Sequence, residues 1–131
     1  HQPTAAVPHF QAAVAADPKA LPAALGLAKA ALAAKQPELP AEAAGSVLFA
    51  LGPTDHLTPD QLNMMGAAHT LVGQALSHRN LEDQAFEHFR RASAIVPAAP
   101  EPWRAMAAHY LRQADETQAL ATLEAGSNPA T

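Results

Sequence analysis

Residues 85–97, AFEHFRRASAIVP, show a spacing from which the fold can be inferred. Ala85, Phe89 and Ala92 are four and three residues apart, which places their side chains on one stripe of a helix. Pro97 ends this helix, because proline has no N–H to donate and its ring clashes with the preceding turn. The stretch therefore predicts a short helix whose small–large–small face packs against a close neighbour.

The composition of the 131-residue chain favours closely packed helices in one domain. Hydrophobic residues make up 49% of the chain, but more than half of them are alanine and only 5% of the chain is aromatic. Alanine has the highest helix propensity, and its small side chain lets helices approach one another. No stretch shows the apolar–polar alternation of a half-buried strand, so we expect an all-α protein.

The charge and the missing cysteines exclude several classes of function. The net charge is −4 without a Lys/Arg-rich run, so we expect no nucleic-acid partner. No apolar stretch is long enough for a membrane span. The absence of cysteine excludes disulfides, thiolate metal sites and cysteine nucleophiles, but leaves the compartment open.

The Ala/Pro-rich composition suggests a bacterial source, with the cytoplasm and the periplasm as alternatives. Because the first residue is His1, we expect a fragment, a processed form or a trimmed chain.

The spacing of residues 85–97 recurs in the chain. Towards the C-terminus it returns as small, large and small residues at Ala119, Leu123 and Gly126. Near the N-terminus the complete pattern is present in Ala6, Phe10, Ala13 and Pro18. The step from Ala85 to Ala119 is one repeat period, whereas the step back to Ala6 is longer than two such periods. We therefore expect a longer, irregular unit between the copies.

A second pattern precedes the two C-terminal copies, with the order large, apolar, small, large. It is formed by Trp103, Met106, Ala107 and Tyr110 in one copy and by His69, Val72, Gly73 and Leu76 in the other. We expect Trp103 and Phe89 to be the main core anchors of this half of the chain.

Together the patterns resemble the tetratricopeptide repeat (TPR), a helix–turn–helix unit of about 34 residues that reads W-x₂-L-G-x₂-Y, then A-x₃-F, then P. The resemblance is good over 66–97 and 100–126, partial over 5–18, and weak over 19–53, where the slots hold Ala24, Leu27, Ala28 and Ala31. His69 departs from the pattern in the Trp slot, and Thr131 in the Pro slot.

The resemblance implies one domain over residues 1–131, a right-handed α-solenoid of about seven helices. Its expected parts are a half-repeat (5–18), a degenerate repeat (19–57), two repeats (59–97 and 100–126) and a tail (127–131).

Capping signals indicate where the helices begin. Asp17-Pro18 opens 18–35, Thr58 with Gln61 opens 59–78, Asn80 opens 81–95, and Asp115 with Gln118 opens 116–125. Further helices are expected at 5–16 and 41–51.

The resemblance also implies that the first helices line a concave surface that recognises a protein or peptide. Helix geometry places seven candidate residues on this surface: Lys29, Thr70, Gln74, His78, Arg104, Ala108 and Arg112. The three cations Lys29, Arg104 and Arg112 fit a partner with acidic or carboxylate groups. The alternative is that these helix faces carry Arg and Lys only for solubility.

We expect no metal, cofactor or catalytic site. The chain has seven histidines, but none are four residues apart, as a helical metal site requires. We expect His69 to pack in the Trp slot, and His88 and His109 to lie on helix surfaces. The sequence contains no G-x-S-x-G motif and no glycine-rich phosphate loop.

The sequence therefore predicts a non-catalytic scaffold for protein–protein interaction. The alternative is an accessory TPR segment of a larger bacterial enzyme or envelope assembly that positions a substrate or partner. We also expect oligomerisation through the terminal helices. Helix 5–16 would leave Val7, Phe10 and Val14 with an unfilled side, and helix 116–125 would expose Leu120 and Leu123.

Overall fold

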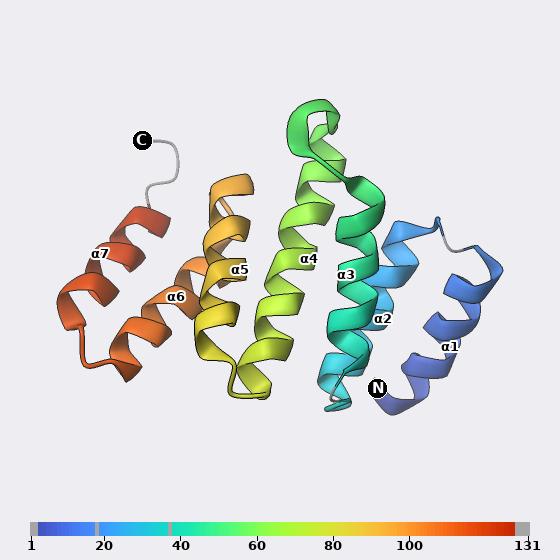
Figure 1. The fold of residues 1–131 in the computed structure, drawn as a ribbon, viewed down its shortest axis with the longest axis horizontal. Coiled ribbons are helices and arrows are strands. Elements are labelled where there is room, and N and C mark those ends of the chain that lie inside the picture. The colour runs from blue at the N-terminus through green and yellow to red at the C-terminus, as the bar shows by residue number, and fades with distance from the viewer. Residues whose placement is uncertain (1–2, 18, 37, 128–131) are drawn as a thin grey trace.

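The computed structural model describes residues 3–17, 19–36 and 38–127. Within these ranges the chain forms seven α-helices and a short 3₁₀-helix, η1, and no strand. The helices are α1 (Pro3–Ala16), α2 (Leu21–Ala33), α3 (Leu39–Leu51), η1 (Thr54–His56), α4 (Pro59–His78), α5 (Glu82–Ile95), α6 (Pro100–Arg112) and α7 (Glu116–Ser127). They stack in chain order, with α1 and α7 at opposite ends (Figure 1). The prediction of an all-α solenoid is confirmed.

Three turns of the same geometry join the helix pairs α2–α3, α4–α5 and α6–α7. Each contains a residue in the left-handed region: Lys35, Asn80 and Ala114, with φ of 61°, 62° and 60°. The N–H of each of these residues donates to the carbonyl three residues upstream, as in Asn80 N–H to Ser77 O. The next N–H donates to the carbonyl five residues upstream, as in Leu81 N–H to Leu76 O. These are Schellman caps, which end one helix and turn the chain into the next.

The spacing of the three turns shows where the irregular unit is longer than the C-terminal repeat. The interval from Lys35 to Asn80 exceeds the interval from Asn80 to Ala114. Most of the additional length lies in α4, which has 20 residues where α6 has 13. Much of the remainder lies in the connection that contains η1, between α3 and α4.

The helix starts agree with the sequence in two cases. Thr58 forms the predicted capping box: its hydroxyl accepts from Gln61 N–H, and Gln61 Oε1 accepts from Thr58 N–H. Asp115 also caps as predicted, since its carboxylate accepts from Gln118 N–H at 3.1 Å. Helix α7 extends to Ser127, and residues 128–131 of the predicted tail lie outside the described residues.

Two predicted caps are wrong. Helix α2 begins at Leu21 after Ala20, because Asp17 accepts from Lys19 N–H and so stabilises a turn instead of a helix start. Pro18, the other half of this signal, lies outside the described residues. Asn80 does not cap α5 either; its left-handed conformation ends the α4 turn, and Leu81 is the N-cap.

In the part of the chain that the structure describes, the core forms two clusters along the array. The larger joins α1 to α4 and contains the slots of the degenerate unit, Ala24, Leu27, Ala28 and Ala31, all buried. The smaller joins α5 to α6 through Ala85, Phe89 and Met106. Phe89 also lies on Gly73 of α4. Helix α5 therefore contacts both α4, the first helix of its own pair, and α6, the first helix of the next pair.

The prediction that α1 leaves Val7, Phe10 and Val14 with an unfilled side is wrong for Val7, which is buried at 6% exposure. Helix α2 covers this face of α1, and the ring of Phe10 lies against Gly26, where a Cβ atom would be only 2.6 Å from Phe10 Cε1. Phe10 and Val14 are half-buried against the same core. At the other end, Leu120 and Leu123 are exposed, at 59% and 42%.

Candidate functional site

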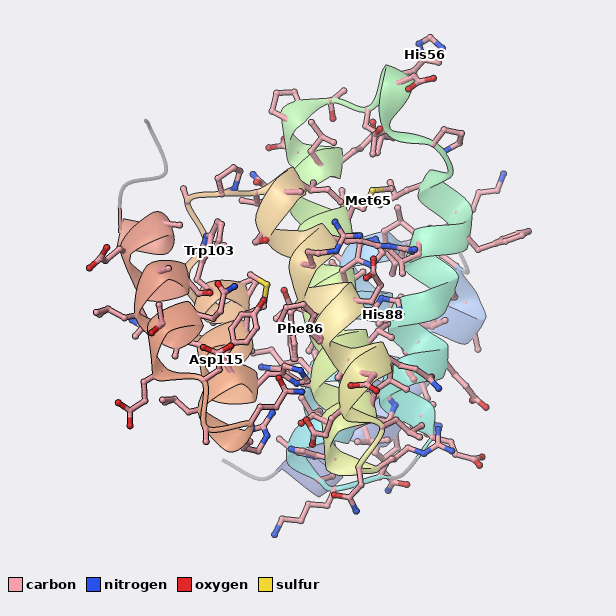
Figure 2. All side chains as sticks on the ribbon, turned by 60° about the vertical axis from the view of Figure 1, so that its left-hand side comes forward. His56, Met65, Phe86, His88, Trp103 and Asp115 are labelled. Atoms are coloured by element: carbon pink, nitrogen blue, oxygen red, sulfur yellow. The ribbon has the colours of Figure 1, made fainter. Side chains whose placement is uncertain are left out.

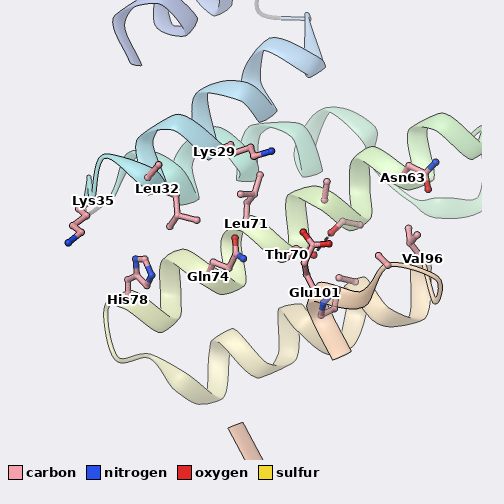
Figure 3. Close-up of a pocket in the computed structure, with 16 residues that line it drawn as sticks. Lys29, Leu32, Lys35, Asn63, Thr70, Leu71, Gln74, His78, Val96 and Glu101 are labelled. Carbon is pink, nitrogen blue, oxygen red and sulfur yellow. Dashed lines mark hydrogen bonds between the residues drawn. The ribbon is translucent and has the colours of Figure 1, made fainter. Parts of the chain in front are cut away.

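A groove of about 740 Å³ runs along α4. Helix α2 forms one wall, and the end of α5 with the start of α6 forms the other (Figure 3). Leu32 of α2, Leu71 of α4 and Val96 after α5 supply apolar surface. The groove lies where the first helices of three successive pairs face one another.

Charged and polar side chains are distributed unevenly along the groove. Lys35 and His78 lie at one end, and Asn63 lies at the other (Figure 3). Lys29 projects from the α2 wall, and Glu101 stands on the α6 wall. An elongated ligand would therefore meet positive charge on α2 and at the Lys35 end, and a carboxylate on the wall opposite Lys29.

Four of the seven candidate residues line this groove: Lys29, Thr70, Gln74 and His78. Thr70 is buried, and its hydroxyl donates to Gly66 O within α4 at 2.9 Å. Its methyl-bearing side chain is thus part of the floor, while Gln74 and His78 offer polar atoms.

The other three candidates lie elsewhere. Ala108 and Arg112 line a neighbouring hollow of about 160 Å³, which shares Gln74 and His78 with the groove. Arg104 is exposed and lines neither space.

Arg112 already has a carboxylate partner within the chain. Its guanidinium donates to Glu82 Oε2 at 2.8 Å, and the same carboxylate accepts from the Ser77 hydroxyl at 3.3 Å. The pair is solvent-exposed and joins α6 to the start of α5. A partner that used Arg112 would have to compete with Glu82.

Sequence reasoning missed the wall formed by the α5–α6 connection. Val96 and Ala99 belong to it, Pro102 follows in the first turn of α6, and Lys35 belongs to the α2–α3 turn. The sequence pattern assigned the surface to first-helix faces alone, so connections could not appear in it. Pro97 was the available signal, because it places a fixed turn beside the groove.

The prediction for the histidines is confirmed at His69 but not at His88 or His109. His69 is buried in the Trp slot, as predicted, and His88 is half-buried, with a distance of 3.0 Å between the two Nδ1 atoms. His109 was expected on the surface but is 9% exposed, because its ring stacks on Phe86 with 4.6 Å between centroids. Figure 2 labels Phe86 and His88 on α5.

Burial, and then the positive charges of His88 and Arg91, lower the pKa of His69 from 6.5 to about 4. The pKa of His88 is also lowered, first by burial and then by Arg91. Both rings are therefore neutral at pH 7, and one Nδ1–H donates to the other Nδ1. In the described part of the chain, no three His, Asp or Glu side chains gather as metal ligands would.

No family model matches the sequence, and no curated protein matches it. Among solved structures, the crystal structure of MamA is similar, with a TM-score of 0.45 and 13% sequence identity over 94% of this chain and 85% of that chain. The helix pairs α2–α3, α4–α5 and α6–α7 repeat one helix–turn–helix arrangement with equivalent turns. None of the helices in residues 3–17, 19–36 and 38–127 has the length and apolar character of a membrane span.

Proposed function

We propose that this chain is a non-catalytic scaffold that holds a peptide segment of a partner protein in the groove along α4. The observation that carries the proposal is the pairing of apolar surface from Leu32, Leu71 and Val96 with Lys29 on the α2 wall and with Lys35 and His78 at one end of the groove. The groove has a volume of about 740 Å³, which accommodates several side chains of an extended peptide. The units that build it would be 19–57, 59–97 and the start of 100–126.

The charge distribution favours a partner segment with acidic residues next to apolar ones. The apolar side chains would cover Leu71 and Val96, and a carboxylate would reach Lys29 or Lys35. Arg104 and Arg112, which the sequence suggests as further cations, lie outside the groove, and Arg112 is paired with Glu82. Lys29 is therefore the cation on which the proposal depends.

A peptide-display selection against the purified chain tests the proposal. We expect the selected peptides to combine Asp or Glu with Leu, Ile, Val or Phe. The variant Lys29→Glu should weaken their binding by about tenfold or more, since a charge-assisted contact becomes a repulsion. The matched control is Lys19→Glu, because Lys19 is exposed before α2 and does not line the groove. Peptides without acidic residues, or equal losses in both variants, would contradict the proposal.

The alternative function, an accessory segment of a larger bacterial enzyme or envelope assembly, stays a prediction. The parent open reading frame tests it, because a catalytic or envelope domain encoded in the same chain would favour it. The groove proposal differs in that the isolated chain must bind the peptide by itself.

We propose self-association through α7 as a further property of the array. Leu120 is 59% exposed on this terminal helix, and burial of such a side chain is favourable. Light scattering over a range of concentrations should show a dimer that Leu120→Glu converts to a monomer. Gln118→Glu is the control, because residue 118 lies on the opposite side of the helix at about 100° per residue. A wild-type chain that stays monomeric at high concentration would contradict the proposal.

A further inference from the structure

A second pocket, of about 360 Å³, lies between the end of α3, the connection after it, α4 and α5. It shares no lining residue with the groove along α4, so a ligand bound there would be independent of the proposed function. Leu48 of α3, Met65 of α4 and Ile95 of α5 give it an apolar lining. Figure 2 looks onto this side of the array, where Met65 is labelled. The volume is at the lower end of the range for small-molecule sites.

Two arginines place a net positive charge on the α5 side of this pocket. Arg90 and Arg91 both line it, and none of the described residues that line it is acidic. Both guanidiniums share a single carboxylate, that of Glu87, with Arg91 Nε at 3.6 Å and Arg90 closer. One carboxylate compensates one of the two charges. The α3 side and the connection at 52–54 contribute no charged lining residue, so one positive charge is left beside an apolar surface.

His69 supplies a polar atom within this apolar lining. The residue is 7% exposed and lines the pocket, and its Nδ1 is engaged with His88. Its other ring nitrogen, Nε2, has no hydrogen-bond partner among the described residues. Every fully buried side-chain nitrogen or oxygen atom of these residues does have a hydrogen-bond partner. Nε2 is therefore not fully buried, and His69 is one of the residues that line the pocket. When His88 donates to His69 Nδ1, the His69 proton lies on Nε2, which becomes a donor towards the pocket.

We propose that this pocket binds a small aliphatic carboxylate, whose head group lies between Arg91 and His69 Nε2 and whose chain covers Leu48, Met65 and Ile95. A monoanion matches the single uncompensated charge, and a carboxylate accepts from a guanidinium with good geometry. The apolar tail removes water from the three apolar side chains. A multiply charged ligand such as a phosphate would meet only one net cation and would leave this apolar surface uncovered.

Three probes separate the parts of this proposal: octanoate, acetate and octylammonium. We expect octanoate to shift the His69 ring resonances and the Met65 methyl resonance in NMR spectra at pH 7, saturably and together. Acetate lacks the tail and octylammonium has the wrong charge, so neither should saturate these shifts over the same concentration range. Equal effects of octanoate and octylammonium would overturn the proposal, as would the absence of saturable octanoate binding.

Two variants test the contacts without disturbing the core. Arg91→Gln should weaken octanoate binding by about tenfold, through loss of a charge-assisted hydrogen bond. Arg79→Gln is the control, since Arg79 is exposed at the C-cap of α4 and does not line the pocket. Ala94→Trp fills the pocket from an exposed lining position and should abolish the shifts with an unchanged melting temperature. Octanoate binding that survives Ala94→Trp, or that is as tight in Arg91→Gln as in the wild type, would overturn the assignment of the site.

Discussion

The ring of Phe89 on α5 lies directly on Gly73 of α4: a Cβ atom at Gly73 would be 2.7 Å from Phe89 Cε1 and 2.9 Å from Cζ. Real Cβ atoms do not approach another carbon so closely, so the pair fixes the distance between the two helices. Phe89 is 5% exposed and packs with Met106 of the next unit, and its ring has little room to move. The contact therefore determines both the α4–α5 pairing and its connection to α6.

Gly73→Ala should destabilise the protein by about 1–2 kcal/mol in chemical denaturation, because overpacking outweighs the gain in helix propensity. Gly45→Ala on α3 is the matched control, since a Cβ atom there would have nothing within 4 Å. It should stabilise the protein by about 0.5–1 kcal/mol through propensity alone. An equal gain in both variants would show that Phe89 does not pack as described.

Phe89→Ala should cost more than Trp103→Ala, although the sequence pattern gives both residues the same weight. Phe89 is buried, and its truncation should cost about 3–5 kcal/mol. Trp103 is half-buried against α7, and its Nε1–H donates to Pro97 O at 2.9 Å, so we expect a loss of about 2–3 kcal/mol. Urea denaturation of the two variants measures the difference. A larger cost for Trp103→Ala would place the main anchor in α6 instead of α5.

Ala114→Gly should stabilise the protein by about 0.5–1 kcal/mol, because φ of 60° is unfavourable for a residue with a Cβ atom. The variant keeps both hydrogen bonds of the turn, from Ala114 N–H to Leu111 O and from Asp115 N–H to Tyr110 O. Ala108→Gly, within α6, should instead destabilise by about 1 kcal/mol. The midpoints of thermal unfolding should therefore move in opposite directions; a decrease for both would refute the left-handed turn.

The His69–His88 pair should make stability fall as pH decreases from about 6.5 to about 4. The folded protein holds the pKa of His69 at about 4, so over this range the unfolded chain binds the proton first. The loss attributable to His69 is on the order of 3 kcal/mol, complete near pH 4 and absent above pH 7. Protonation of His69 in the folded protein is unfavourable first because the ring is buried, and then because it adds charge beside His88 and Arg91.

Denaturation curves at several pH values check this, with His69→Gln as the test variant. We expect His69→Gln to lose a large part of the pH dependence between 6.5 and 4, because its amide does not titrate in this range. His56→Gln, on the exposed η1, should follow the wild type. If His69→Gln had the same pH dependence as the wild type, the buried pair could not be its source.

Local chemistry was enough to predict the helical units. The Ala85–Phe89–Ala92 spacing and the Thr58–Gln61 cap act within a few residues, so propensity and periodicity suffice to place them. The caps failed at Asp17 and Asn80, because their side chains or backbones stabilise turns that compete with a helix start.

The groove could be predicted only in part. Lys29, Gln74 and His78 could be assigned to it from their helix faces. Val96 and Ala99 reach it only because the α5–α6 connection folds back beside α4, which no helix face indicates.

The repeating helices were thus readable from the amino-acid order, because each depends on contacts within one turn or one cap. The Glu82–Arg112 pair and the burial of His69 against His88 instead arise from tertiary packing, since their partners lie on different helices. Such contacts depend on how two helices are rotated and offset when they stack. That geometry is fixed by close approaches such as Phe89 on Gly73, and no spacing within a single helix contains it.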